Sequence, residues 1–240
     1  MKRSILVLSV LSMFLLTVSC KKKLVGEGPS VTETRVVTNF TKVSMGLPGI
    51  MYVTQEPGYK LTIDAQQNIL DNIRSVVSGG ELKLYFDWDK RIGKHDKVIV
   101  RVSAPLYDRL NLSGSGDISS SKPIDADVLD LTISGSGSIM LADADVSGIL
   151  HAAVSGSGTI QVNSGVAKTG NFEVSGSGNM EMLGVGFEKV EAHISGSGNI
   201  KATVSQELKA HISGSGSVYY KGSPVVESHV SGSGSVKKVQ

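Results

Sequence analysis

The sequence predicts an all-β protein whose second half is a parallel β-helix, that is, a β-solenoid. The first observation is a repeat of the tetrapeptide Ser-Gly-Ser-Gly, with intervals of 21, 21, 20, 20, 18 and 18 residues. The seven copies begin at Ser113, Ser134, Ser155, Ser175, Ser195, Ser213 and Ser231. A repeat of this length is typical of solenoids, in which each turn buries its apolar face only against its neighbours.

The second observation is a period of two around each motif. The residue before the first serine is Leu, Ile or Val in all seven copies, and the residue five positions after that serine is Ile, Met or Val. These positions share one parity with both glycines, so a strand would direct them inward and the serines outward. Inward glycines indicate a pinched corner or a close approach of two backbones. Each turn is too short for a strand plus a crossover helix, which favours strands stacked about 4.8 Å apart.

Residues 31–110 have strand patterns without the clean repeat, and they predict irregular N-terminal coils or a capping sheet. The segments that read as strands are 43–47, 50–54, 61–65, 81–86 and 98–102. Ser78-Gly79-Gly80 indicates a tight turn, and residues 69–77 fit either a short helix or a loop. An end coil has to cover its apolar interior, so we expect a cap here. A seven-coil repeat region then occupies residues 111–240.

The N-terminus predicts a lipoprotein signal peptide over residues 1–19. A basic start precedes an apolar run that is short for a membrane span, and the run ends at Cys20, the one cysteine of the chain. We therefore expect lipidation at Cys20 and a lipid-anchored tether over residues 20–30. The alternative is a cleaved secretory peptide with an incidental cysteine. Lys21 follows the cysteine, a pattern that resembles lipoproteins sorted to the outer membrane. The sequence does not decide between the periplasmic face and the surface face of that membrane.

Charge excludes one class of partner. The chain has 24 Lys and Arg against 22 Asp and Glu, and two of the basic residues lie in the expected signal peptide. The mature domain is therefore balanced, and a balanced surface gives no electrostatic footprint for nucleic acid. We expect the membrane as a partner through the lipid anchor, and no nucleic acid.

Three stretches carry a resemblance to a known family: residues 38–44 (Thr-Asn-Phe-Thr-Lys-Val-Ser), residues 79–84 (Gly-Gly-Glu-Leu-Lys-Leu) and residues 110–117. With the serial Ser-Gly-Ser-Gly motifs, residues 35–236 resemble the bacterial family called auto-transporter adhesin, head GIN domain. The resemblance implies a right-handed β-helix in an envelope-anchored protein of Gram-negative type. It implies no catalytic residues and no cofactor.

A column of histidines is the first candidate site. His193, His211 and His229 each lie two residues before a motif, so they should point outward on adjacent coils. Stacked imidazoles would bind a divalent transition metal, with Glu191 or Glu173 nearby. The alternative is a solvated ladder of side chains without a metal.

Two further candidates are a group of aspartates and a tryptophan. Asp125, Asp127, Asp143 and Asp145 bunch on two adjacent coils, where clustered carboxylates would supply oxygens to calcium. Aspartate is also an ordinary turn residue. Trp88, flanked by carboxylates, is typical of a sugar-stacking site, with a cap residue as the alternative.

The sequence favours a non-catalytic cell-envelope lipoprotein, adhesin-like or a scaffold, that presents its β-helical surface to a glycan or an envelope protein. One alternative is a carbohydrate-active β-helix enzyme, a polysaccharide lyase or hydrolase, which needs a groove with paired carboxylates or a metal. Residues 111–240 lack long excursions that would wall such a groove, so we expect no enzyme. The other alternative is an envelope sensing or assembly component, with homo-oligomers formed through the coil ends.

Overall fold

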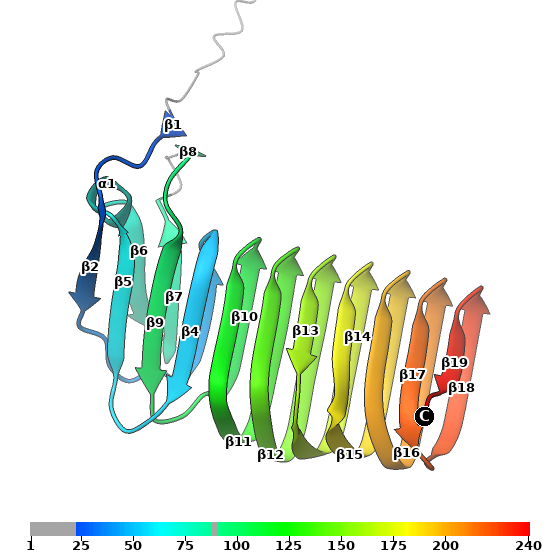
Figure 1. The fold of residues 1–240 in the computed structure, drawn as a ribbon. Coiled ribbons are helices and arrows are strands. Elements are labelled where there is room, and N and C mark those ends of the chain that lie inside the picture. The colour runs from blue at the N-terminus through cyan, green and yellow to red at the C-terminus, as the bar shows by residue number, and fades with distance from the viewer. Residues whose placement is uncertain (1–22, 88–90) are drawn as a thin grey trace, which may run out of the picture.

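The computed structural model describes residues 23–87 and 91–240, and Figure 1 shows them as one elongated stack of strands. Strands account for 74% of the described residues and helix for 2%, and the stack is a β-solenoid of about six turns. The expected signal peptide, Cys20 and Trp88 lie outside the described residues. No helix within 23–87 or 91–240 is long and apolar enough to cross a membrane.

The repeat region consists of strands that pair in parallel from one coil to the next. They are β10 (Arg109–Gly114), β11 (Asp117–Gly135), β12 (Ser138–Gly156), β13 (Thr159–Val162), β14 (Gly165–Gly176), β15 (Asn179–Gly196), β16 (Asn199–Gly214), β17 (Ser217–Gly222), β18 (Val225–Gly232) and β19 (Ser235–Lys238). Motif serines face one another across successive strands: Ser134 lies beside Ser155, and Ser155 beside Ser175. The predicted parallel β-solenoid is therefore confirmed, and the seven motif copies bound six turns.

The predicted apolar columns form one core along the solenoid axis. The residues before the first six motifs, from Leu112 to Ile212, are at most 2% exposed. The seventh, Val230, lies on β18, the last strand of this column in the structure, and is 43% exposed. Burying an aliphatic side chain contributes about 1.5–3 kcal/mol, so coil-to-coil stacking of this core stabilises the fold.

The two glycines of each motif play different parts, which corrects the prediction that both face inward. The second glycine is buried: a Cβ on Gly137 would lie 2.0 Å from the Gly116 carbonyl oxygen. The first glycine is partly exposed, because a positive φ, 139° at Gly135, turns the chain there and interrupts the strand alternation. Its carbonyl still continues the ladder, since the Ser136 amide donates to the Gly114 oxygen at 2.9 Å.

Residues 42–55 form a coil in register with the repeat, although they lack its motif. β3 (Lys42–Gly46) pairs in parallel with β10, and β4 (Gly49–Gln55) with β11. Met45 lies beside Leu112 and Ile50 beside Asp117, so Gly46-Leu47-Pro48-Gly49 occupies the corner of a Ser-Gly-Ser-Gly motif. Glycine at the fourth position is retained where the backbones approach.

Another coil lies on the far side of β3 and β4, and the chain reaches it out of order. β7 (Glu81–Phe86) pairs with β3, and β9 (Val98–Ala104) pairs with β4, both in parallel. The chain must then cross the β3–β4 coil to begin β10. Tyr107 lies in this crossing, fully buried, with its hydroxyl 3.1 Å from the Val102 carbonyl and 3.2 Å from that of Thr54.

Three antiparallel strands close this end. They are β2 (Ser30–Arg35), β5 (Lys60–Gln66) and β6 (Ile73–Ser78), with β5 on β9, β2 on β5 and β6 on β7. Gly79 and Gly80 have φ of 59° and 73°, which suits the tight turn that the sequence predicted there and that joins β6 and β7 into a hairpin. Residues 69–77, expected as a helix or a loop, are divided between the short helix α1 (Gln67–Leu70) and β6. The expected irregular coils and the expected cap are both present.

Residues 23–30, expected as a tether, lie against the cap. β1 (Lys23–Leu24) pairs in parallel with β8 (Arg91–Ile92). The Gly26 amide donates to the Lys94 carbonyl at 2.9 Å, and the Asn68 side chain donates to the Val25 carbonyl at 2.7 Å. The folded domain therefore begins before residue 31.

Candidate functional site

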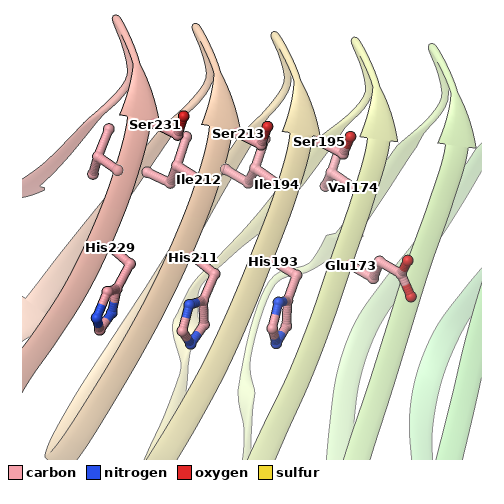
Figure 2. A pocket seen from close by; sticks show the side chains of 11 residues that line it. Glu173, Val174, His193, Ile194, Ser195, His211, Ile212, Ser213, His229 and Ser231 are labelled. Atoms are coloured by element: carbon pink, nitrogen blue, oxygen red, sulfur yellow. The ribbon is translucent and has the colours of Figure 1, made fainter.

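An open groove of about 850 Å³ runs across the last four coils, on the face that precedes the motif corner (Figure 2). Histidines form one side of it and motif serines the other, with apolar residues between them. The lining residues are Glu173, Val174, His193, Ile194, Ser195, His211, Ile212, Ser213, His229, Val230 and Ser231. The apolar and serine columns repeat the same kind of group from coil to coil, and the histidine column does so on three coils, with Glu173 in its place on the fourth.

The parallel register positions the histidines. Glu173 lies beside His193, His193 beside His211, and His211 beside His229, on β14, β15, β16 and β18. The imidazole rings stack face to face: the centroids of His193 and His211 are 4.9 Å apart, and those of His211 and His229 are 5.2 Å apart. The row is visible in Figure 2, with Glu173 continuing it on the next coil. The predicted outward column is present.

Glu191 lies next to the histidine column, on the same strand as His193. It lies two residues before His193, on the same outward face, and its Oε1 is 2.9 Å from His193 Nε2. This hydrogen bond lowers the pKa of the Glu191 carboxyl, so the group is ionised near neutral pH. Within the described chain, Glu191, His193 and His211 are the set of three whose ligand atoms all lie within 4.8 Å of one another. Glu173, the other expected neighbour, lies outside that set.

The four aspartates of the calcium hypothesis lie on adjacent coils, as expected, but within strands β11 and β12. Asp125 lies beside Asp145, and both are exposed. Asp127 accepts a hydrogen bond from the Ser147 hydroxyl, and Asp143 accepts one from Ser164. In the described ranges these carboxylates do not form a set of three at ion-binding distance. Calcium binding stays a prediction without a gathered set of ligands.

The outer polar columns hydrogen-bond along the solenoid. In the column four residues after the first serine, Ser138 donates to Asp117 at 2.9 Å, and Asn199 donates to Asn179 at 3.1 Å. The motif serines themselves are exposed and repeat on every coil. Seven equivalent hydroxyls indicate a structural and surface role, because a nucleophile requires one singular environment.

Sequence reasoning missed a second groove, of about 630 Å³, at the opposite corner of the coils. Its lining residues include Val166, which is 58% exposed, together with Lys168, Phe187, Glu188 and Thr203. Strand register shifts between Met182 and Gly186, so the alternation that predicts inward and outward faces fails at this corner. An apolar residue at a position where the alternation predicts an outward polar side chain, such as Val166, was the sequence feature that could have indicated this groove.

Comparisons with known proteins identify relatives of the whole solenoid. A family model described as "Putative auto-transporter adhesin, head GIN domain" matches residues 39–224. A crystal structure of a "putative adhesin" from Bacteroides fragilis is similar at 26% identity and a TM-score of 0.85, covering 90% of this chain and 100% of that one. Comparison with curated proteins finds no match.

Two Parabacteroides structures have the same fold. A "putative lipid binding protein" from P. distasonis is 25% identical with a TM-score of 0.74, covering 91% of this chain and 100% of that one. A "putative adhesin" from P. merdae is 22% identical with a TM-score of 0.73, covering 91% of this chain and 99% of that one. The last similarity supports the fold alone.

Proposed function

We propose that this chain, which belongs to the auto-transporter adhesin, head GIN domain family, is a non-catalytic, adhesin-like lipoprotein that binds an extended glycan along its solenoid. The adhesin description of the family and of the B. fragilis relative supports a place in the cell envelope. Cys20, after an apolar run, supports a lipid anchor at the outer membrane. The chain would then stand on the membrane as a short rod.

The observation that carries this proposal is the groove of about 850 Å³ across the last four coils. Its polar groups recur from coil to coil, with neighbouring imidazoles 4.9 and 5.2 Å apart. A linear polysaccharide also presents the same hydroxyl groups at each sugar, at a comparable repeat length. Hydroxyl and imidazole edges are suitable hydrogen-bond partners for such groups.

The composition of the groove argues against the polysaccharide enzyme. Glycoside hydrolysis generally needs two carboxyl groups on either side of the bond that is cleaved. Among the residues that line this groove, Glu173 is the one carboxylate. We therefore propose binding without cleavage.

A binding experiment with matched variants tests the proposal. Ser213→Trp would place an indole in the groove, whereas Ser134→Trp makes the same change in the same column outside it. On a glycan array and in envelope-polysaccharide pull-downs, we expect Ser213→Trp to abolish binding and Ser134→Trp to retain it. Cleavage of a polysaccharide, or binding only to an envelope protein or to phospholipid vesicles, would overturn the assignment to a glycan.

The anchor requires its own measurement. We expect mass spectrometry to find acyl chains on Cys20, and Cys20→Ala to release the protein from the outer-membrane fraction. Protease treatment of whole cells then distinguishes the surface face from the periplasmic face. Unmodified Cys20 in membrane-bound protein would refute the lipoprotein assignment.

A further inference from the structure

The histidine column has a chemical feature that glycan binding does not require. Imidazole nitrogens and a carboxylate oxygen come together on two adjacent strands, β15 and β16, with their ligand atoms within 4.8 Å of one another. The groups are accessible: the side chains of His193 and Glu191 are 49% and 52% exposed. Neutral imidazole with carboxylate is a ligand set that zinc and related divalent transition metals take.

From this geometry we infer that Glu191, His193 and His211 form a binding site for a divalent transition metal ion of the zinc class. Two ligand atoms on a tetrahedral zinc are about 3.3 Å apart. The ligand atoms lie within 4.8 Å of one another on two exposed side chains and one half-buried side chain, so side-chain rotation would bring them to that separation without movement of the β-ladder. Two nitrogens and one oxygen leave a fourth position for water, an open type of site.

Neighbouring charges favour this set. Lys209 lies beside Glu191 in register, but its ammonium group forms an ion pair with Glu207 at 3.2 Å. Glu207 also forms an ion pair with Lys189 at 3.5 Å. Glu191 is therefore left to face His193, which it contacts at 2.9 Å. A divalent cation bound by both residues would replace the proton that lies between Glu191 Oε1 and His193 Nε2, because these groups ligate a metal in their deprotonated form.

The same columns elsewhere in the solenoid do not offer this combination. Asp130 and His151 lie beside each other in the column of Glu191, two residues before the column of His193, but Arg109 pairs with Asp130 at 2.7 Å. Their strands carry Thr132 and Ala153 in the column where β15 and β16 carry histidine. His229 lies two coil steps from His193, about 10 Å away, beyond the reach of an ion that His193 holds.

The site is tested by calorimetric titration of the full chain with Zn²⁺ alone at pH 7.5. We expect one ion per chain, and affinity at least about tenfold lower in each of His193→Gln, His211→Gln and Glu191→Gln. His229→Gln and His151→Gln are the matched controls, because each removes an imidazole outside the set, and both should bind like the parent chain. Circular dichroism melts verify that every variant is folded.

X-ray absorption spectroscopy of the Zn²⁺-loaded parent chain is a second measurement that does not depend on any variant being folded. We expect it to show two imidazole nitrogens bound to the zinc ion. Absence of Zn²⁺ binding overturns the inference. So does an equal loss in His229→Gln and His211→Gln, which would indicate diffuse binding along the ladder. The outcome is independent of the glycan proposal, since binding of the metal is measured without a sugar present.

Discussion

The two ends of the solenoid differ in whether further strands cover its apolar interior. At the N-terminal end, strand pairing changes from parallel to antiparallel, and β2, β5 and β6 close the stack. At the C-terminal end the stack stops with β18 and β19 (Figure 1), and every residue of β18 is exposed. Each coil of a repeat presents strand edges and an apolar surface that the next coil would cover. An end of the stack is therefore covered only where the chain departs from the repeat.

Arg35 shows what the closed end gains. Its guanidinium, with the side chain 16% exposed, donates to the Ile73 carbonyl at 2.7 Å and to the Leu70 carbonyl at 3.0 Å. It also meets Glu33 at 2.8 Å. One side chain thus satisfies backbone oxygens from α1 and β6 and joins them to β2.

The open end has no counterpart to Arg35 in the described chain. Val225, Val226 and Val230 are 76%, 38% and 43% exposed, and the outer edges of β18 and β19 have no strand beyond them. Such an edge is a template for pairing with another chain. Homo-oligomer formation through this end stays a prediction.

The largest expected effect contrasts an interior coil with the last one. Leu208 and Val226 occupy the same column on neighbouring strands, but Leu208 is fully buried. Leu208→Ala should lower the free energy of unfolding by about 2–5 kcal/mol. Val226→Ala should lower it by less than about 1 kcal/mol. Urea denaturation followed by circular dichroism measures both, and an equally large loss at Val226 would mean that this end is covered in solution.

The corner glycines give the next contrast. A Cβ on Gly137 would lie 2.0 Å from the Gly116 oxygen, and one on Gly234 would lie 2.4 Å from the Gly216 oxygen. Gly137→Ala should cost about 3 kcal/mol, because coils on both sides hold the backbone in place. Gly234→Ala should cost less than about 1 kcal/mol, because the last coil moves away freely. Thermal melts of the two variants measure this difference. An equal loss of stability in both would contradict the expectation that the last coil can move.

Arg35→Met tests the cap. Loss of charged hydrogen bonds to two carbonyls should cost about 2 kcal/mol and speed hydrogen exchange in β6. Arg109→Met is the control, since its ion pair with Asp130 is exposed and contributes at most about 1 kcal/mol. Unchanged exchange in β6 would show that hydrophobic packing alone holds the cap.

Tyr107 gives the smallest effect and a dependence on pH. Tyr107→Phe should cost about 1 kcal/mol, because one buried hydrogen bond to a carbonyl is lost. Burial raises the pKa of the Tyr107 hydroxyl. The unfolded chain therefore ionises first, and stability falls as pH rises above the ordinary tyrosine pKa of about 10. The difference between parent and Tyr107→Phe should shrink above that pH, and a constant difference in alkaline melts would refute this origin.

Much of the architecture followed from local pattern. The apolar columns, the exposed serines and the column of His193, His211 and His229 were all predicted, because a parallel ladder repeats each position one coil later. The strands β3, β4, β5, β7 and β9 were also predicted from their alternation, whereas β6 was wrongly expected as a helix or a loop. Glu191 was named beside the histidines for the same reason: it shares their parity.

The remainder depended on contacts that no local pattern records. The inserted β3–β4 coil, the crossing at Tyr107 and the cap that Arg35 holds are pairings between distant segments. The expectation that both motif glycines face inward was wrong for the first one, since parity cannot register a positive φ. The second groove was missed where the strand register shifts.

By itself, the sequence determined that the chain is a solenoid with hydroxyls and imidazoles in outward rows, because side-chain alternation and a constant interval depend only on neighbours along the chain. Only the tertiary structure decided which strands close the N-terminal end and that the ligand atoms of Glu191, His193 and His211 lie within 4.8 Å of one another. Those facts depend on which strand lies beside which, and on how far two side chains on adjacent coils reach. The order of the strands and the distances between side chains on adjacent coils depend on how the whole stack packs, and that packing selects one arrangement.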